Sequence, residues 1–116
     1  AVTNTDDHLR NHAFILTEQG WILSPLYDVN PVPYGDELSL NVDEEDNSIS
    51  VELAISTAVR FGISETDAKD YAKGILETVR ENWEKTASGY GLNRRQIEEM
   101  RPAFSACYER RKYNIR

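Results

Sequence analysis

The longest helical pattern in the chain is residues 64–88, which read SETDAKDYAKGILETVRENWEKTAS. Its apolar side chains recur every three or four residues, as the core-facing stripe of a helix does. Ser64 followed by Asp67 resembles a capping box, and Gly89 and Gly91 follow the last apolar position. The stretch therefore predicts one long helix ending near Ser88. Its predicted core stripe is Ala68, Tyr71, Ala72, Ile75, Leu76, Val79 and Trp83.

Shorter helical patterns flank this helix on both sides. From Ser50 onward the apolar residues again follow a helical period, and Gly62 is a typical residue just past a helix end. Asn93 with Gln96 starts a third pattern, in which Pro102 should kink the helix. The first pattern consists of Val51, Ala54, Ile55, Ala58 and Val59, and the third of Ile97, Met100, Phe104, Cys107 and Tyr108.

The N-terminal part of the chain predicts strands and loops. The segments 13–17 and 21–24 are β-prone and are separated by a short connection containing Gly20, which predicts a hairpin. Pro25, Pro31 and Pro33 exclude a regular helix after it, and residues 37–41 alternate as a short strand would.

We therefore predict a mainly helical α+β fold, with a short N-terminal β-hairpin followed by about three packed helices. Residues 1–49 would form a hairpin segment and residues 50–116 a helical segment, together making one partial domain. Residues 50–113 should hold most of the core, because their three apolar stripes can pack on one another.

Length and composition restrict the class of protein. The chain has 116 residues, 40% of them hydrophobic and 28% charged, which is typical of one soluble globular domain. A single cysteine, Cys107, excludes an internal disulfide and a cysteine zinc cluster. No apolar run approaches a membrane span, and no signal peptide precedes Thr3. We expect a cytoplasmic, reduced protein that does not bind membranes.

Charge is distributed unevenly along the chain. Residues 1–56 carry eleven acidic residues and one basic residue, within a net charge of −7. Such an acidic half does not wrap DNA, although it can hold a divalent cation. A calcium loop starting at Asp43 is rejected, because Ser48 replaces the turn glycine and Ala54 replaces the bidentate acid.

The most informative motif is residues 4–11, NTDDHLRN, followed by Asp28 after the predicted hairpin. An Asp with an Asn five positions later is the spacing of the protein-kinase catalytic loop, and a second Asp after a ribbon holds the metal there. Carboxylate and amide oxygens suit Mg²⁺. We therefore expect Asn11 and Asp28 to meet at the open end of the hairpin, with Asp6 pointing into the same cleft. Arg10 and His8 are candidates for contacts to phosphate.

Other interpretations of the motif remain open. Asp6, Asp7 and Asn11 would equally suit turn capping, which is a frequent role of these residue types. His8 and His12 lie four residues apart, but the sequence offers neither a Glu after His8 nor a third zinc ligand at suitable spacing.

Two stretches, NTDDHLRNHAF at 4–14 and GWILSPLYDVNP at 20–31, closely resemble the C-terminal domain of HipA-like kinases. That family's pattern is roughly N-x-D-x-H-x-K-N-x-x-F, then W-x-L-x-P-x-Y-D. The resemblance implies a serine/threonine protein kinase, the toxin of a bacterial toxin–antitoxin pair, and the C-terminal lobe portion of a kinase-like fold. It implies Asp6 as catalytic base and Asn11 and Asp28 as magnesium ligands. Arg10 replaces the family's usual lysine.

The resemblance also implies partners. They are ATP with Mg²⁺, a protein substrate and a DNA-binding antitoxin. The family's nucleotide-covering loop and phosphate-pairing lysine lie upstream of the matching motifs. We therefore expect a C-terminal fragment that is inactive alone and exposes the apolar surface that met the upstream lobe.

The alternative function is a non-catalytic helical module that docks an antitoxin or another partner through a basic final helix. A helix-turn-helix around residues 89–93 is a third interpretation, but the net charge argues against direct nucleic-acid binding. The basic residues of the final region are Arg94, Arg95, Arg101, Arg110, Arg111, Lys112 and Arg116.

Overall fold

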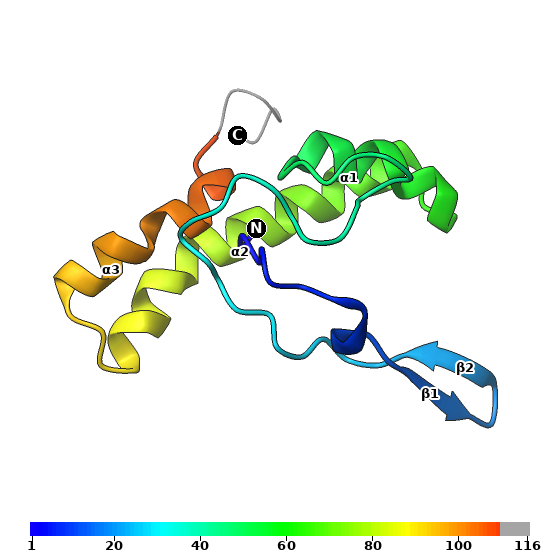
Figure 1. The fold of residues 1–116 in the computed structure, drawn as a ribbon, viewed down its shortest axis with the longest axis horizontal. Coiled ribbons are helices and arrows are strands. Elements are labelled where there is room, and N and C mark those ends of the chain that lie inside the picture. The colour runs from blue at the N-terminus through cyan, green and yellow to red at the C-terminus, as the bar shows by residue number, and fades with distance from the viewer. Residues whose placement is uncertain (110–116) are drawn as a thin grey trace.

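The computed structural model describes residues 1–109. The fold is mixed α+β and mainly helical, as the sequence predicts. Figure 1 shows α1, α3 and η3 lying along the long helix α2, while the hairpin projects away from them. The elements are, in order, the 3-10 turn η1 (Leu9–Asn11), β1 (Phe14–Thr17), β2 (Gly20–Leu23), α1 (Val51–Thr57), η2 (Ala58–Phe61), α2 (Glu65–Gly89), α3 (Arg94–Met100) and η3 (Arg101–Cys107).

The helices begin at the polar residues that the sequence indicates. The Ser64 side chain accepts a hydrogen bond from the Asp67 backbone N–H at 3.1 Å and caps α2. Asn93 and Gln96 form a complete capping box at the start of α3. Pro102 follows the end of α3, and the chain continues as the tighter helix η3. The predicted caps and the predicted interruption at Pro102 are therefore confirmed.

The core lies between α2 and η3. The rings of Trp83 and Phe104 stack with their centroids 4.1 Å apart and their planes 12° apart. Ala103 is 1% exposed beside them, and Leu76, about two turns before Trp83 on α2, is 2% exposed against Cys107. Burial raises the pKa of the Cys107 thiol, which lowers the fraction of thiolate at neutral pH. The buried residues within 1–109 are Thr57, Ala58, Ala68, Leu76, Trp83, Ala103, Phe104 and Cys107.

The predicted apolar stripes of the helices include residues that do not pack against another element. Tyr71 is 64% exposed and Ile75 is 56% exposed, although both belong to the apolar stripe of α2. Val59 and Tyr108 are also exposed. These predictions of burial are wrong, because α1, α3 and η3 cover only part of the apolar surface of α2.

The strand predicted at residues 37–41 is also wrong. This segment has an isolated bridge between Glu37 and Ser48 instead of a ladder. The loop after it is held by side chains: Asp43 accepts from two backbone N–H groups, and the Asn47 amide donates to the Leu38 carbonyl at 2.8 Å. Such local side-chain bonds compete with strand pairing.

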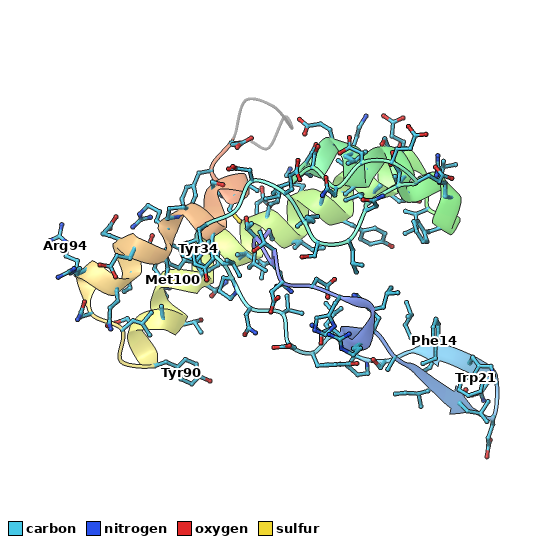
Figure 2. The ribbon with its side chains drawn as sticks, viewed as in Figure 1. Phe14, Trp21, Tyr34, Tyr90, Arg94 and Met100 are labelled. Carbon is cyan, nitrogen blue, oxygen red and sulfur yellow. The ribbon has the colours of Figure 1, made fainter. Side chains whose placement is uncertain are left out.

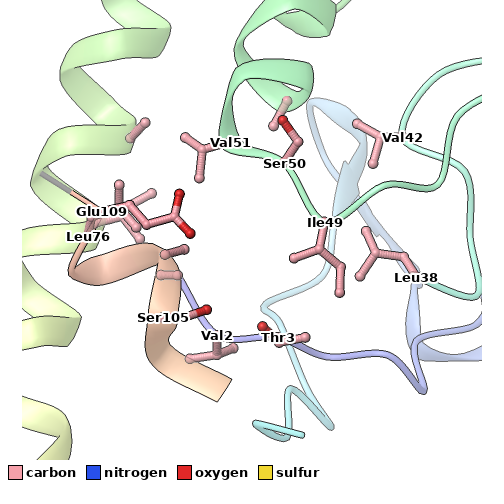
Figure 3. A pocket seen from close by; sticks show the side chains of 15 residues that line it. Val2, Thr3, Leu38, Val42, Ile49, Ser50, Val51, Leu76, Ser105 and Glu109 are labelled. Carbon is pink, nitrogen blue, oxygen red and sulfur yellow. The ribbon is translucent and has the colours of Figure 1, made fainter. Parts of the chain in front are cut away.

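The irregular N-terminal half is tied to the helices through its backbone. The Thr3 N–H donates to the Ala103 carbonyl at 2.9 Å, and the Val32 N–H donates to the Thr3 carbonyl at 2.6 Å. An apolar cavity of about 320 Å³ lies beside this connection, with Leu38 and Ile49 facing Val51 and Leu76 across it (Figure 3). The helices therefore support the loops that carry the motif residues.

The hairpin is apolar on both faces. Its strands pair in the register Phe14–Leu23, Ile15–Ile22 and Leu16–Trp21, and all six of these side chains are exposed. Phe14 and Trp21 extend outward at the far end of the molecule in Figure 2. An exposed apolar surface was expected from the sequence, and the hairpin provides one.

None of the helices described within residues 1–109 is long and apolar enough to cross a membrane. Four residues of the predicted basic final helix, Arg110, Arg111, Lys112 and Arg116, lie outside the described residues.

Replacing Phe104 by Ala should lower the free energy of unfolding of this chain by about 3–5 kcal/mol, because it removes the ring stacked on Trp83. Urea denaturation followed by Trp fluorescence measures the loss. Phe14→Ala is the matched control, because Phe14 is 65% exposed and its truncation should change stability by about 0.5 kcal/mol or less. Equal losses in both variants would contradict this location of the core.

The ion pair between Arg101 and Glu98 should make the stability of the fold depend on pH. Its hydrogen bonds hold the pKa of Glu98 below the ordinary value of 4.5. A lowered carboxyl pKa stabilises the fold above that value, and the stabilisation is lost as pH falls through the folded-state pKa. Glu98→Gln should therefore lower the urea midpoint at pH 7, and the difference should disappear as the pH falls through the folded-state pKa of Glu98.

In an Arg101→Met background, Glu98→Gln should have no pH-dependent effect on the urea midpoint. A pH-dependent difference that persisted in this background would show that a group other than Arg101 lowers the pKa of Glu98.

Candidate functional site

Asp6 and Asp28 lie on one cavity. Its volume is about 410 Å³, and it is formed where the loop before η1 meets the segment that follows β2. Both aspartates are exposed to solvent. The structure thus brings together the predicted catalytic base and one predicted metal ligand, from positions 22 residues apart in the sequence. The cavity is lined by Asn4, Thr5, Asp6, Asp28, Asn30, Val32 and Tyr34.

Asp28 has an unusual backbone conformation. Its φ is +56°, in the left-handed region, and no other non-glycine residue within 1–109 has a positive φ. Asp tolerates this region better than most residues, but the conformation still costs free energy and is found often at functional sites. The Asn30 side-chain amide donates a hydrogen bond to Asp28 Oδ1 at 2.6 Å. The Asn4 amide lies 3.5 Å from the Asp28 carbonyl oxygen.

Asn11 is the last residue of η1 and lies on a neighbouring cavity of about 430 Å³. Tyr27 and Val29, which flank Asp28 in the sequence, line this second cavity together with Asn11. Asn4 lines both cavities. Asp28 and Asn11 therefore lie on adjoining cavities, and their pairing on one Mg²⁺ stays a prediction.

The side chains of Asp6 and Asn11 make no hydrogen bond to other residues in the part of the chain that is described. Asp7 has a different role, since its carboxylate lies 2.8 Å from His12 Nε2. Turn capping, the alternative interpretation of this motif, thus does not occupy Asp6 or Asn11. Both remain able to contact a ligand.

His8 and Arg10 differ in their surroundings. The Nδ1 atom of His8 is buried and has no hydrogen-bond partner among residues 1–109. A buried polar nitrogen without a partner is costly, so His8 Nδ1 is a position that an ordered water or a bound ligand would satisfy. Arg10 is exposed, and its guanidinium is open to solvent beside the loop.

Two contacts position the loops that carry the motif. The Tyr27 hydroxyl donates to the Arg10 carbonyl at 2.8 Å and joins the segment before Asp28 to η1. The Ser39 hydroxyl donates to the Thr5 carbonyl at 2.6 Å and holds the loop before η1. Gly35, with φ +97°, packs so closely that a Cβ there would lie 3.1 Å from Thr5.

Sequence reasoning missed Asn30, Tyr27 and Ser39 as residues that support the site. An Asn two residues after an Asp is a signal for a local side-chain bond, and it could have indicated Asn30. The partners of Tyr27 and Ser39 are 17 and 34 residues away, so no local pattern indicates them.

Within residues 1–109, no three His, Cys, Asp or Glu side chains are grouped closely enough to hold a metal ion by themselves. A cation at this site would therefore bind through one or two carboxylates, amide oxygens and the oxygens of a ligand. Mg²⁺ binds in this manner when it accompanies a nucleotide, because it keeps several waters and takes oxygen from phosphate.

Replacing Tyr27 by Phe should loosen the connection between η1 and the segment around Asp28. The lost hydrogen bond predicts a decrease in unfolding free energy of about 0.5–1.5 kcal/mol. Amide hydrogen exchange of residues 24–30 should become faster than in the wild type. Tyr90→Phe is the control, because Tyr90 is 85% exposed. Unchanged exchange around Asp28 in the Tyr27 variant would mean that this bond does not position the segment.

Comparison with known proteins gives one match. The family model of the HipA-like C-terminal domain matches residues 1–83. No curated protein and no solved structure matches the chain. The matched region includes Asp6, Asn11 and Asp28, together with the hairpin and most of α2. The chain belongs to the HipA-like C-terminal domain family.

Proposed function

We propose that this chain is the C-terminal catalytic portion of an ATP- and Mg²⁺-dependent serine/threonine protein kinase of the HipA type. The observation that carries the proposal is the common cavity of Asp6 and Asp28. These are the two acidic residues that the kinase motif requires.

The proposed reaction is phosphoryl transfer. The oxygen of a serine or threonine hydroxyl attacks the γ-phosphorus of ATP, the bond from that phosphorus to the β–γ bridging oxygen breaks, and ADP leaves. The hydroxyl proton passes to the carboxylate of Asp6, which is exposed and not occupied by hydrogen bonds within the described residues. Such a reaction depends mainly on positioning and charge neutralisation, and needs no covalent enzyme intermediate.

The residues present fit a magnesium ion. One oxygen of Asp28 accepts from Asn30, and the other has no protein partner within residues 1–109. Asn11 offers an amide oxygen from the adjoining cavity. These are hard oxygen ligands, and when bound, Mg²⁺ would neutralise the charge of the phosphates.

Arg10 and His8 have proposed roles toward the nucleotide. The exposed guanidinium of Arg10 can offset phosphate charge with forked donors, which a lysine cannot reproduce. The buried Nδ1 of His8 has no hydrogen-bond partner among residues 1–109 and is therefore available to a ligand.

The wider context is also a proposal. A HipA-type kinase would act in the cytoplasm as the toxin of a toxin–antitoxin pair, with a protein substrate and a DNA-binding antitoxin as partners. The alternative, a module that docks partners through basic residues, has less support in the described region. Arg95 pairs with Glu99, and Arg101 pairs with Glu98 and Glu84, so two of the three basic residues of that region that lie within residues 1–109 have acidic partners.

Replacing Asp6 by Asn in the protein as its gene encodes it should slow phosphoryl transfer from ATP by roughly 10²–10⁴-fold, because the proton acceptor is lost at unchanged size. Asp28→Asn should also slow the transfer and raise the Mg²⁺ concentration needed for half-maximal rate. Transfer of labelled γ-phosphate to protein is the measurement.

Asp36→Asn is the matched control, because Asp36 is an exposed aspartate outside both cavities. Its rate should equal that of the wild type. Normal rates for both the Asp6 and the Asp28 variants would exclude the kinase function.

A further inference from the structure

We propose that Asn30 is a positioning residue that holds the carboxylate of Asp28 for binding Mg²⁺. This inference rests on the kinase function proposed above. It concerns a residue to which neither the kinase spacing nor the family pattern gives a role, and its basis is the geometry around Asp28.

The hydrogen bond between the two side chains has a defined direction. An ionised carboxylate only accepts, so the group 2.6 Å from Asp28 Oδ1 must be the amide N–H₂ of Asn30. A bond of this length to a charged acceptor is among the stronger hydrogen bonds in proteins. It engages Oδ1 and leaves Oδ2 without a protein partner within residues 1–109. The contact therefore fixes the carboxylate without occupying both of its oxygens.

The backbone that follows Asn30 is anchored on the helical core. Pro31 follows Asn30 and restricts the backbone of Asn30 to extended conformations. Pro31 is half-buried on the apolar groove that Trp83 and Phe104 line, and the next residue, Val32, donates its N–H to Thr3. Asn30 thus connects an exposed aspartate to a segment that is fixed on the helical core.

The backbone of Asp28 needs this support. Its left-handed conformation has a free-energy cost and persists only when neighbouring contacts maintain it. Without the Asn30 amide, the carboxylate can rotate away from the cavity that it shares with Asp6. Partners that orient a metal ligand in this manner typically contribute 10–100-fold to metal affinity or activity.

The test uses the protein as its gene encodes it, with Mn²⁺ as the probe and electron paramagnetic resonance as the readout of binding without turnover. Asn30→Ala should weaken Mn²⁺ binding by about 10-fold or more. It should also raise the Mg²⁺ concentration for half-maximal phosphoryl transfer, while the KM for the protein substrate stays unchanged. Asn30→Gln keeps an amide donor and should recover part of the affinity.

Asn82→Ala is the matched control, because it removes an amide that bonds to the Thr78 carbonyl within α2 and lines neither the cavity of Asp28 nor that of Asn11. Its Mn²⁺ affinity should equal that of the wild type. Asn30 is exposed, so Asn30→Ala should keep the wild-type circular dichroism spectrum. If both Asn30 variants unfolded the protein, the role of Asn30 would be structural and the proposal would be overturned.

The outcomes separate this proposal from the kinase function. If Asp28→Asn loses Mn²⁺ binding and Asn30→Ala keeps it, the role of Asn30 is wrong and the kinase function stands. If neither variant changes Mn²⁺ binding or phosphoryl transfer, the kinase function itself fails.

Discussion

The stacking of Trp83 on Phe104 is the contact on which the rest of the structure depends. It joins α2 to η3, and the Arg101 guanidinium lies 5.4 Å above the Trp83 ring while pairing with Glu84. Because η3 is fixed in this manner, the Ala103 carbonyl is available at a defined place for the N–H of Thr3. The N-terminal half has no buried side chain before Thr57 within the described residues, so it takes its position from the helices.

The candidate site follows from this arrangement. Asp6 and Asp28 lie on loops whose ends are tied to Thr3, and the cavity between them owes its shape to a few backbone and side-chain hydrogen bonds. Exposed loops held at their ends suit the proposed kinase site, which would have to admit a nucleotide and a protein hydroxyl. The cost is low local stability, since the loops bury little apolar surface.

The sequence predicts what is local in this fold. The caps at Ser64 and Asn93, the hairpin and the break at Pro102 depend on neighbouring residues, and each is confirmed. Burial on α2 depends on how far α1 and η3 extend over it, so the exposure of Tyr71 and Ile75 could not be read from their spacing. The motif indicated Asp6 and Asp28, but the left-handed backbone of Asp28 belongs to the folded loop alone.

The family similarity ends at Trp83, inside α2 and before the ring that stacks on this residue. The region that matches the family model therefore ends before the residues that complete the core around Trp83. A chain cut at residue 83 would leave Leu76 and Trp83 facing water, because Cys107, Ala103 and Phe104 cover them from beyond the cut. Any attempt to transplant the Asp6–Asp28 region into another protein would have to carry residues 84–107 with it, as a scaffold that holds no motif residue.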